Sequence, residues 1–287
     1  MSVSAIILAA TLPVLDFATN SITQRIAGAD PAVCLSRFVD YPPSKGVLGF
    51  PRCLWSKPFK VNEKFWLKDV DFSCVSPWND ECGALRAGTA ISRRHVIFAR
   101  HFPLWKGMRI LFVDGTGEVC PCNVEAVKVI PKCDIAIASL NAELTPNIKV
   151  AKILPADFEK YIGDGKGLPI VTFNQKEETS LTYLSSFPEQ GSTQYTIYGK
   201  EPSEERQRLF RKKLVGGDSG NPAFLLIGSE PVLLYCLTIG GIGNGHAIHL
   251  FRKEIQAAMD ELCPGYKLEA FDFEKVRCDD DGRKKQQ

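Results

Sequence analysis

The chain lacks any run of about 18 apolar residues, so the sequence excludes a hydrophobic helix that spans a membrane. It also lacks an excess of one charge: 35 Lys and Arg residues oppose 33 Asp and Glu residues, for a formal net charge of +2. This balance indicates no nucleic-acid partner, because such partners favour clustered positive charge. Internal repeats are absent too. The 287 residues, 45% hydrophobic and 24% charged, have the composition of one large globular domain or two small ones.

The paired cysteines typical of zinc sites are also missing. Only Pro121 separates Cys120 from Cys122, and no second pair follows at the spacing of a zinc finger. We therefore expect neither a metal nor another cofactor. For the ten cysteines, a few disulfides, for example Cys74 with Cys82, together with buried free thiols are the favoured interpretation. The pairing itself cannot be deduced from the sequence.

The segment from Ala5 to Leu15 (AIILAATLPVL) is similar to the apolar region of a secretory signal. No Lys or Arg precedes it, however, and no A-x-A cleavage site follows. The alternative is an apolar segment that packs on the fold. Together with the number of cysteines, the segment favours a secreted or periplasmic protein, with a cytoplasmic location as the alternative.

Short apolar runs, separated by Gly, Pro and Asp turns, predict β-strands in two series along the chain. The runs lie at residues 109–113, 124–130, 135–140, 170–173, 195–198, 223–227 and 233–239. Strands at this spacing indicate sandwiches or barrels rather than βαβ units.

One amphipathic helix is predicted near the C-terminus, where Cys263-Pro264-Gly265 ends it. Its apolar face consists of Leu250, Phe251, Ile255, Ala258, Met259 and Leu262. The predicted organisation is an N-terminal extension, two β modules, this helix and a polar tail. These parts cover residues 1–60, 61–145, 146–250, 251–263 and 264–287 respectively.

The strongest local motif is Gly216-Gly217-Asp218-Ser219-Gly220-Asn221-Pro222. Attack on an acyl carbon requires a hydroxyl on a tight turn, with backbone N–H groups that face the developing oxyanion. The glycines permit the backbone conformations that such a turn requires, and the amides of Gly217 and Ser219 could then form an oxyanion hole. A plain surface turn is the alternative. The apolar strand that follows (AFLLI) favours the functional interpretation because it anchors the turn.

A serine nucleophile requires an imidazole that accepts its proton. Of the four histidines, His101 comes at the end of an apolar strand, whereas His95 is expected at the exposed beginning of the same strand. Asp134 directly precedes another apolar run, where a carboxylate is costly unless it is hydrogen-bonded. We therefore expect a partner for it. A turn residue at the start of a strand is the alternative for Asp134 taken alone.

The order His101, Asp134, Ser219, each within its own framing sequence, resembles the trypsin/chymotrypsin-like serine protease family. GTAISRRHVIFARH is similar to the family's hairpin that ends in the catalytic histidine, CDIAIASL to its aspartate strand and GGDSGNP to its nucleophile turn. The resemblance covers residues 83–262. It implies an all-β fold of two six-stranded antiparallel β-barrels, packed together with the triad at their junction and followed by a C-terminal α-helix.

The resemblance also implies an activity, that of a serine endopeptidase that cleaves polypeptides through an acyl-enzyme. Thr238-Ile239-Gly240-Gly241 is similar to the edge strand that pairs with the substrate backbone, so Thr238 and Gly240 are candidate substrate-binding residues. Lys213 would lie at the base of the primary specificity pocket, with His246 nearby, and would favour Asp or Glu side chains. The alternative for residues 211–213 is a solvated basic run.

Three positions depart from the family pattern. Phe102 and Val215 stand where the family commonly has disulfide cysteines, and Asn221 stands where it usually has glycine. We expect Asn221 to be tolerated because Asn adopts unusual backbone dihedral angles. Arg25-Ile26-Ala27-Gly28 is similar to the family's activation site, whose new amino terminus would pair with Asp218. It lies far from His101 in the chain, so a chance match is the preferred interpretation.

Two other functions remain open. A binding module with the same fold but no turnover is one, although the sequence keeps all three triad residues. Hydrolysis of esters by the same triad is the other. A nucleophile elbow is excluded because Asn221 breaks G-x-S-x-G and because His101 and Asp134 precede the serine. The sequence does not determine the oligomeric state.

Overall fold

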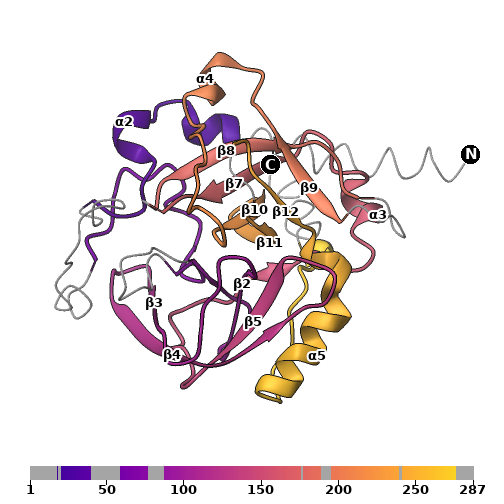
Figure 1. Ribbon diagram of the computed structural model, residues 1–287. Helices are drawn as coiled ribbons and strands as arrows, with labels where there is room; N and C mark the ends of the chain where they lie inside the picture. Colours follow the sequence, from indigo (N-terminus) through magenta and orange to yellow (C-terminus); the bar gives the residue numbers. More distant parts are fainter. Residues whose placement is uncertain are drawn as a thin grey trace, which may run out of the picture.

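The computed structural model describes residues 18, 21–39, 59–76, 87–175, 177–188, 195–238 and 241–275. These residues form a mostly β protein with two curled sheets and few helices (Figure 1). The predicted all-β class is confirmed. The sheets hold five and seven strands, however, rather than the six and six that we predicted.

The first sheet, in the lower half of Figure 1, has the strand order β1-β2-β5-β4-β3, with antiparallel pairs throughout. Its strands are β1 (Thr89–Ala90), β2 (His95–Ala99), β3 (Arg109–Val113), β4 (Val119–Val129) and β5 (Ile135–Leu140). Every residue of β2 and β5 is buried, as expected for short continuous apolar runs. These two strands pair so that Ala99 faces Ile135, which brings the end of β2 beside the beginning of β5.

The second sheet has the order β12-β9-β8-β7-β10-β11-β6. Only its β11–β6 pair is parallel. Its strands are β6 (Lys152–Ile153), β7 (Pro169–Phe173), β8 (Thr179–Leu184), β9 (Thr196–Lys200), β10 (Pro222–Ile227), β11 (Glu230–Cys236) and β12 (Asn244–His246). The strands predicted in both series are found with shifted ends: β4 begins five residues earlier than predicted and β11 three residues earlier, and residue 239 lies outside the described residues. The predicted module boundary at residues 145 and 146 falls between β5 and β6.

The predicted C-terminal helix is confirmed as α5 (Arg252–Leu262), which follows a short 3-10 turn, η2 (Ile248–Phe251). It follows the second sheet in the chain but packs against β5 and β4 of the first (Figure 1). Ile255, Ala258 and Met259 form its buried face. No helix among the described residues is both long enough and apolar enough to cross a membrane.

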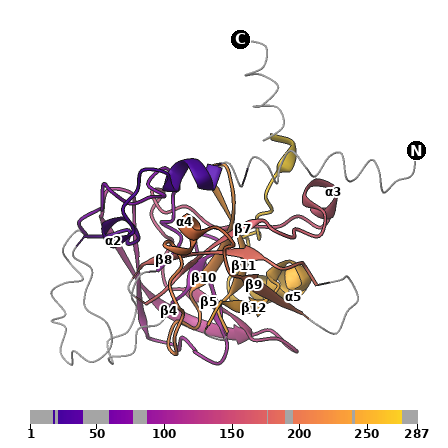
Figure 2. The same ribbon diagram turned by 90° about the horizontal axis from the view of Figure 1, so that it is seen from above.

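Three further helices are one turn long, and each lies beside the second sheet. They are α2 (Pro31–Cys34), α3 (Glu159–Ile162) and α4 (Glu205–Arg208). Figure 2 shows α2 and α3 on opposite sides of this sheet. Asp30 caps α2 by accepting a hydrogen bond from the Ala32 amide at 3.0 Å, and Pro31 occupies the first turn, where no amide donor is needed.

The described part of the N-terminal extension belongs to the core rather than standing apart from it. Ile22, Ile26 and Leu35 are buried in the same hydrophobic cluster as residues of both sheets. Ser36 pairs with Glu178 in an antiparallel bridge beside β8. Residues 21–39 are therefore a structural part of the second half of the molecule. The signal-like segment at residues 5–15 lies outside the described residues.

The predicted polar tail is too long. Ala270 forms a parallel bridge with Ile153, and the Phe271 amide donates to the Ile153 carbonyl at 2.8 Å. Phe273 is buried and stacks on Tyr161 with ring centroids 4.7 Å apart. Residues 264–275 thus continue the fold at the edge of the second sheet, and residues 276–287 lie outside the described residues.

Seven cysteines fall within the described residues, and all of them are free thiols. They are Cys34, Cys74, Cys120, Cys122, Cys133, Cys236 and Cys263. The disulfide predicted for Cys74 is therefore wrong, and its suggested partner, Cys82, lies outside the described residues. Burial raises the pKa of Cys74 to about 12, so this thiol behaves as a small apolar core residue.

Candidate active site

The three predicted catalytic residues meet where the two sheets adjoin. Because Ala99 at the end of β2 pairs with Ile135 at the start of β5, the next residues of both strands emerge at the same edge of the first sheet. His101 lies two residues after β2, and Asp134 directly precedes β5. Ser219 comes from the second sheet, on the turn that leads into β10. The adjoining strands β2, β5 and β10 are buried at every residue, and they fix the backbone positions of His101, Asp134 and Ser219.

A continuous chain of hydrogen bonds joins these side chains. His101 Nε2 lies 2.8 Å from Ser219 Oγ, and His101 Nδ1 is hydrogen-bonded to Asp134 Oδ2. Asp134 Oδ1 also accepts the backbone N–H of His101 at 2.8 Å. The carboxylate thus fixes the ring from two directions. It places the imidazole proton on Nδ1 and leaves Nε2 to accept the serine proton.

The histidine is open to solvent and the aspartate is mostly covered: their side chains are 45% and 19% exposed. A reacting molecule can therefore reach the imidazole, whereas the carboxylate is shielded from water. Shielding strengthens the hydrogen bond between the aspartate and the ring, because the local dielectric constant is lower than that of water.

The predicted oxyanion-hole amides belong to the same turn as Ser219. Gly217 has a φ of 100°, a conformation that favours glycine. Within the described part of the chain, neither the Gly217 amide nor the Ser219 amide donates a hydrogen bond to another protein group. Two backbone donors beside the serine hydroxyl are thus available to an anionic oxygen.

A set of hydrogen bonds to Asp218, which is only 3% exposed, holds this turn. Oδ1 accepts the backbone N–H of Gln175 at 3.1 Å and its Nε2 at 3.3 Å, and Oδ2 accepts the amide of Val215 at 2.6 Å. The carbonyl of Asp218 accepts Asn221 Nδ2 at 3.0 Å. Asn221 does not have a positive φ, so our reason for tolerating it there was wrong: its side chain braces the turn.

Gly220 lies close to the segment that leads into β1. Its φ is 87°, and an added Cβ would lie 3.0 Å from the carbonyl oxygen of Ala87. Its amide donates to the Leu237 carbonyl at 2.8 Å. A side chain at this position would push the nucleophile turn away from the segment that leads into β1.

His246 lies behind the aspartate. Its Nδ1 accepts the backbone N–H of Asp134 at 2.9 Å, so this nitrogen is engaged and cannot bind a substrate. Burial lowers the pKa of His246, although the Asp134 charge opposes the shift. The ring is therefore neutral at pH 7, with its proton on Nε2. The structure thus gives His246 a supporting contact that the sequence did not predict.

Lys213, the predicted specificity residue, is exposed. Its two neighbours in the basic run form ion pairs: Arg211 with Glu201 at 3.0 Å, and Lys212 with Glu178 at 3.5 Å. These contacts favour the alternative of a solvated basic run. The acidic preference stays a prediction.

The predicted substrate-binding edge is only partly described. Thr238 donates its amide to the Asn244 carbonyl at 2.9 Å, and its Oγ1 lies 3.2 Å from Asn244 Oδ1. Gly240 lies outside the described residues. Pairing of this edge with a substrate backbone stays a prediction.

His95 is not at an exposed end of its strand, as we predicted, but has no exposed surface. Its Nδ1 lies 2.8 Å from Ser92 Oγ, and the ring packs edge-on against Tyr266. Burial lowers the pKa of His95 to about 4, so the ring is neutral. The apolar residues that follow His95 in the chain are therefore not its only cover, because Tyr266 of the C-terminal segment packs on the ring.

Ile26 does not contact Asp218, the residue with which the disfavoured activation-site interpretation would pair it. Ile26 is buried, and its carbonyl accepts a hydrogen bond from Arg206 Nη2 at 2.6 Å. Both carboxylate oxygens of Asp218 are occupied by Gln175 and Val215.

No sequence motif pointed to Gln175, because an ordinary loop glutamine carries no recognisable signal.

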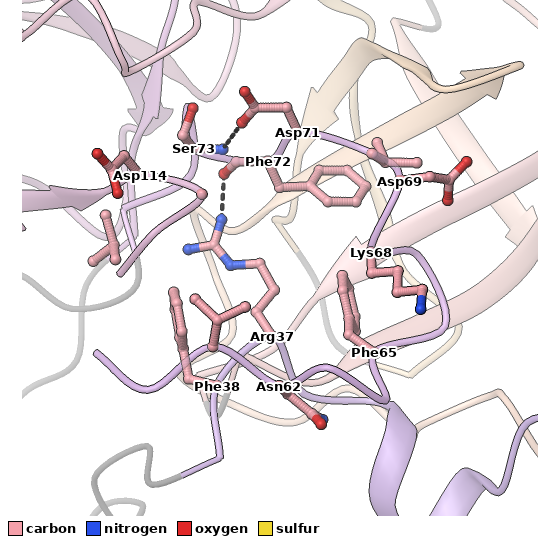
Figure 3. Close-up of a pocket in the computed structure, with 14 residues that line it drawn as sticks. Arg37, Phe38, Asn62, Phe65, Lys68, Asp69, Asp71, Phe72, Ser73 and Asp114 are labelled. Atoms are coloured by element: carbon pink, nitrogen blue, oxygen red, sulfur yellow. Dashed lines mark hydrogen bonds between the residues drawn. The ribbon is translucent and has the colours of Figure 1, made fainter. Parts of the chain in front are cut away.

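A pocket of about 230 Å³ lies elsewhere in the molecule, and Figure 3 shows it around Arg37. Its lining comes from residues 37–38, 61–62, 65, 68–73 and 113–115, none of which is a predicted site residue. Among the described residues, no three His, Cys, Asp or Glu side chains are placed to hold a metal ion.

No family model matches the chain, and no curated protein matches it either.

Proposed function

We propose that this protein is a serine endopeptidase of the trypsin/chymotrypsin-like type, which cleaves peptide bonds through an acyl-enzyme. The observation that carries the proposal is the unbroken chain from Asp134 through His101 to Ser219 Oγ, with 2.8 Å between His101 Nε2 and the hydroxyl. A hydroxyl, an imidazole and a shielded carboxylate in this order form the group that general-base activation of a serine requires.

The proposed reaction has two halves. Ser219 Oγ attacks the peptide carbonyl carbon while His101 Nε2 takes the hydroxyl proton, and the amides of Gly217 and Ser219 stabilise the oxyanion. The C–N bond then breaks, and His101 returns the proton to the leaving amine. Water, deprotonated by the same imidazole, attacks the acyl-enzyme and releases the carboxylic acid and the free serine. Asp134 stabilises the imidazolium in both halves.

The arrangement of the sheets supports this proposal. The base and its carboxylate come from the first sheet and the nucleophile from the second, so the reacting groups face each other across the line where the sheets adjoin. Ligand sites lie preferentially at such interfaces between structural units.

Ester hydrolysis is the second candidate, because the same three side chains and the same two amides would perform it. A peptide leaves as an amine that must be protonated, whereas an alkoxide or phenoxide leaves more readily, so peptides make the stricter demand on His101. A binding module without turnover is disfavoured because no triad member is missing or misplaced.

The test is covalent labelling with a fluorophosphonate, which phosphonylates an activated serine hydroxyl. We expect stoichiometric labelling of the wild-type protein, none of Ser219→Ala, and labelling at the wild-type rate for Ser203→Ala, a variant at an exposed serine outside the site. Persistent labelling of the Ser219→Ala variant would remove Ser219 from the role of nucleophile.

A second measurement separates the two hydrolase candidates. The purified protein is incubated with a mixed peptide library and, in parallel, with an activated aryl ester, and products are identified by mass spectrometry. Peptide cleavage that disappears in Ser219→Ala supports the endopeptidase. Ester turnover with an intact library would favour the esterase instead.

A further inference from the structure

We infer that Gln175 is a positioning residue of the proposed protease. It holds the buried carboxylate of Asp218 and thereby preforms the nucleophile turn in the uncleaved chain. This inference rests on the proposed function. It concerns a loop that lies outside the three framed motifs in the sequence, since Gln175 and Asp218 are 43 positions apart in the chain.

Asp218 is the residue before the nucleophile, and its carboxylate is almost completely removed from water. A buried carboxylate is costly unless hydrogen bonds replace its hydration. Gln175 supplies two of the three donors, its backbone N–H at 3.1 Å and its Nε2 at 3.3 Å. The third comes from Val215 within the turn itself. Gln175 is therefore the main contact between this carboxylate and the rest of the fold.

The glutamine side chain also contacts the other end of the turn. Its Nε2 lies 3.4 Å from the Gly216 carbonyl, so a single amide group bridges Gly216 and Asp218. Gly217, whose amide is a predicted oxyanion donor, lies between these two held residues. Glycine explores many backbone conformations, and fixing its neighbours limits the directions in which its N–H can point.

The described residues of the loop that carries Gln175 make several polar contacts. It joins β7 to β8, and the Asn174 amide donates to the Glu178 carbonyl at 3.0 Å across its base. Glu177 has no exposed surface and a φ of 56°, and its Oε2 lies 3.1 Å from Arg37 Nε. The Arg37 amide also donates to the Glu177 carbonyl.

Arg37 connects this loop to the N-terminal segment. Its guanidinium donates to the Phe72 carbonyl (Figure 3) and lies 4.7 Å from the ring centroid of Phe38. Residues 36–38 and 72 thus contact the loop directly or through Arg37. The segment that we predicted to be an extension is therefore connected to the nucleophile turn through Arg37, Glu177 and Gln175.

A cleaved amino terminus is not needed to fill this position. The donors to Asp218 are already in place, and Ile26, the residue that cleavage after Arg25 would expose, is buried against other groups. We therefore expect the intact chain to hold its nucleophile turn in the reactive conformation.

The experiment compares the rate of fluorophosphonate labelling from pH 5.5 to 8.5 for the wild type, Gln175→Ala, Gln175→Glu and Gln207→Ala. Gln207 is another buried glutamine and has no contact with Asp218, so its variant is the matched control. We expect Gln175→Ala to react about ten- to a hundredfold more slowly, because the side-chain bridge between Gly216 and Asp218 is lost while only the backbone donors to Asp218 remain. Gln207→Ala should react at the wild-type rate.

Gln175→Glu tests the contact through the pH dependence of its labelling rate, which is measured within a single folded variant. Beside the Asp218 carboxylate, the pKa of the introduced carboxyl is raised, and while protonated its single O–H can donate to Asp218, although not to Gly216 as well. The ratio of its labelling rate to that of the wild type should therefore be highest at low pH and fall as pH rises. The ratio isolates the introduced carboxyl, because the two proteins are otherwise identical.

Wild-type rates in Gln175→Ala, together with a pH-independent ratio for Gln175→Glu, would overturn the inference while leaving the proposed function intact. A wild-type protein that no serine probe labels would instead overturn the proposed function, and the inference with it. Thermal denaturation of each variant identifies any that fails to fold, and in that case the pH ratio of Gln175→Glu decides.

Discussion

The buried carboxyl of Glu177 should make the protein less stable as the pH rises. Glu177 has no exposed surface, and burial raises the pKa of its carboxyl from 4.5 to about 7 despite the opposing charge of Arg37. Between these pH values the folded protein holds a proton that the unfolded chain has released. The free energy of unfolding therefore falls with rising pH over this interval, by about 1.4 kcal/mol per pH unit and about 3 kcal/mol in all.

The assay is urea denaturation at half-unit steps from pH 4.5 to 7.5, with wild type, Glu177→Gln and Glu63→Gln compared. Glu63 is exposed and serves as the control. His95 and His249 have pKa values lowered to about 4 by burial, so both raise the stability of every variant between about pH 4 and 6.5. Because all three proteins share this rise, it cancels in the difference between them.

Relative to Glu177→Gln, the wild type should lose about 3 kcal/mol of stability across the series, half of it by about pH 6. Relative to Glu63→Gln, the difference should stay constant. A constant difference for Glu177→Gln as well would show that the folded state does not retain the proton, and would refute the reasoning from burial.

Three further outcomes follow from the site. Asp134→Asn should lower kcat about 10⁴-fold, measured as peptide turnover, because the amide stabilises the wrong imidazole tautomer; a loss below tenfold would contradict this role. Gly220→Ala should destabilise the protein by about 1–3 kcal/mol in urea denaturation, since φ is 87° and the Ala87 oxygen is close, whereas Gly216→Ala, with open space around it, should be nearly neutral. Arg25→Gln should still be labelled by the serine probe, with mass spectrometry showing an uncut chain; labelling only after cleavage elsewhere would argue against a preformed turn.

Much of the fold was predictable because its signals are local. Strands such as Arg109–Val113 and Ile135–Leu140 are short apolar runs with turn residues at both ends, and the terminal helix shows a 3.6-residue period. The strand numbers of the two sheets were not predictable. They depend on which edges pair, and an edge residue such as Ile153 pairs with a strand on one side and with the C-terminal segment on the other.

Errors arose where burial depends on distant segments. His95 looked like the exposed first residue of a strand, but Tyr266 of the C-terminal segment covers it. Residues 21–39 have no clear periodicity and yet contribute Ile22 and Leu35 to the main core. A side chain's own neighbours in sequence do not show which remote segment will cover it.

The sequence by itself determined the residue types of the candidate site, because each of His101, Asp134 and Ser219 lies in a recognisable strand end or turn. Only the tertiary structure decided that His101 and Ser219, 118 positions apart, are within hydrogen-bond distance, and that Gln175 and His246 support their neighbours. The physical reason is that strand and turn formation follows local periodicity and backbone preference. A hydrogen bond between distant residues instead depends on strand register and sheet packing, which leave no local pattern in the chain.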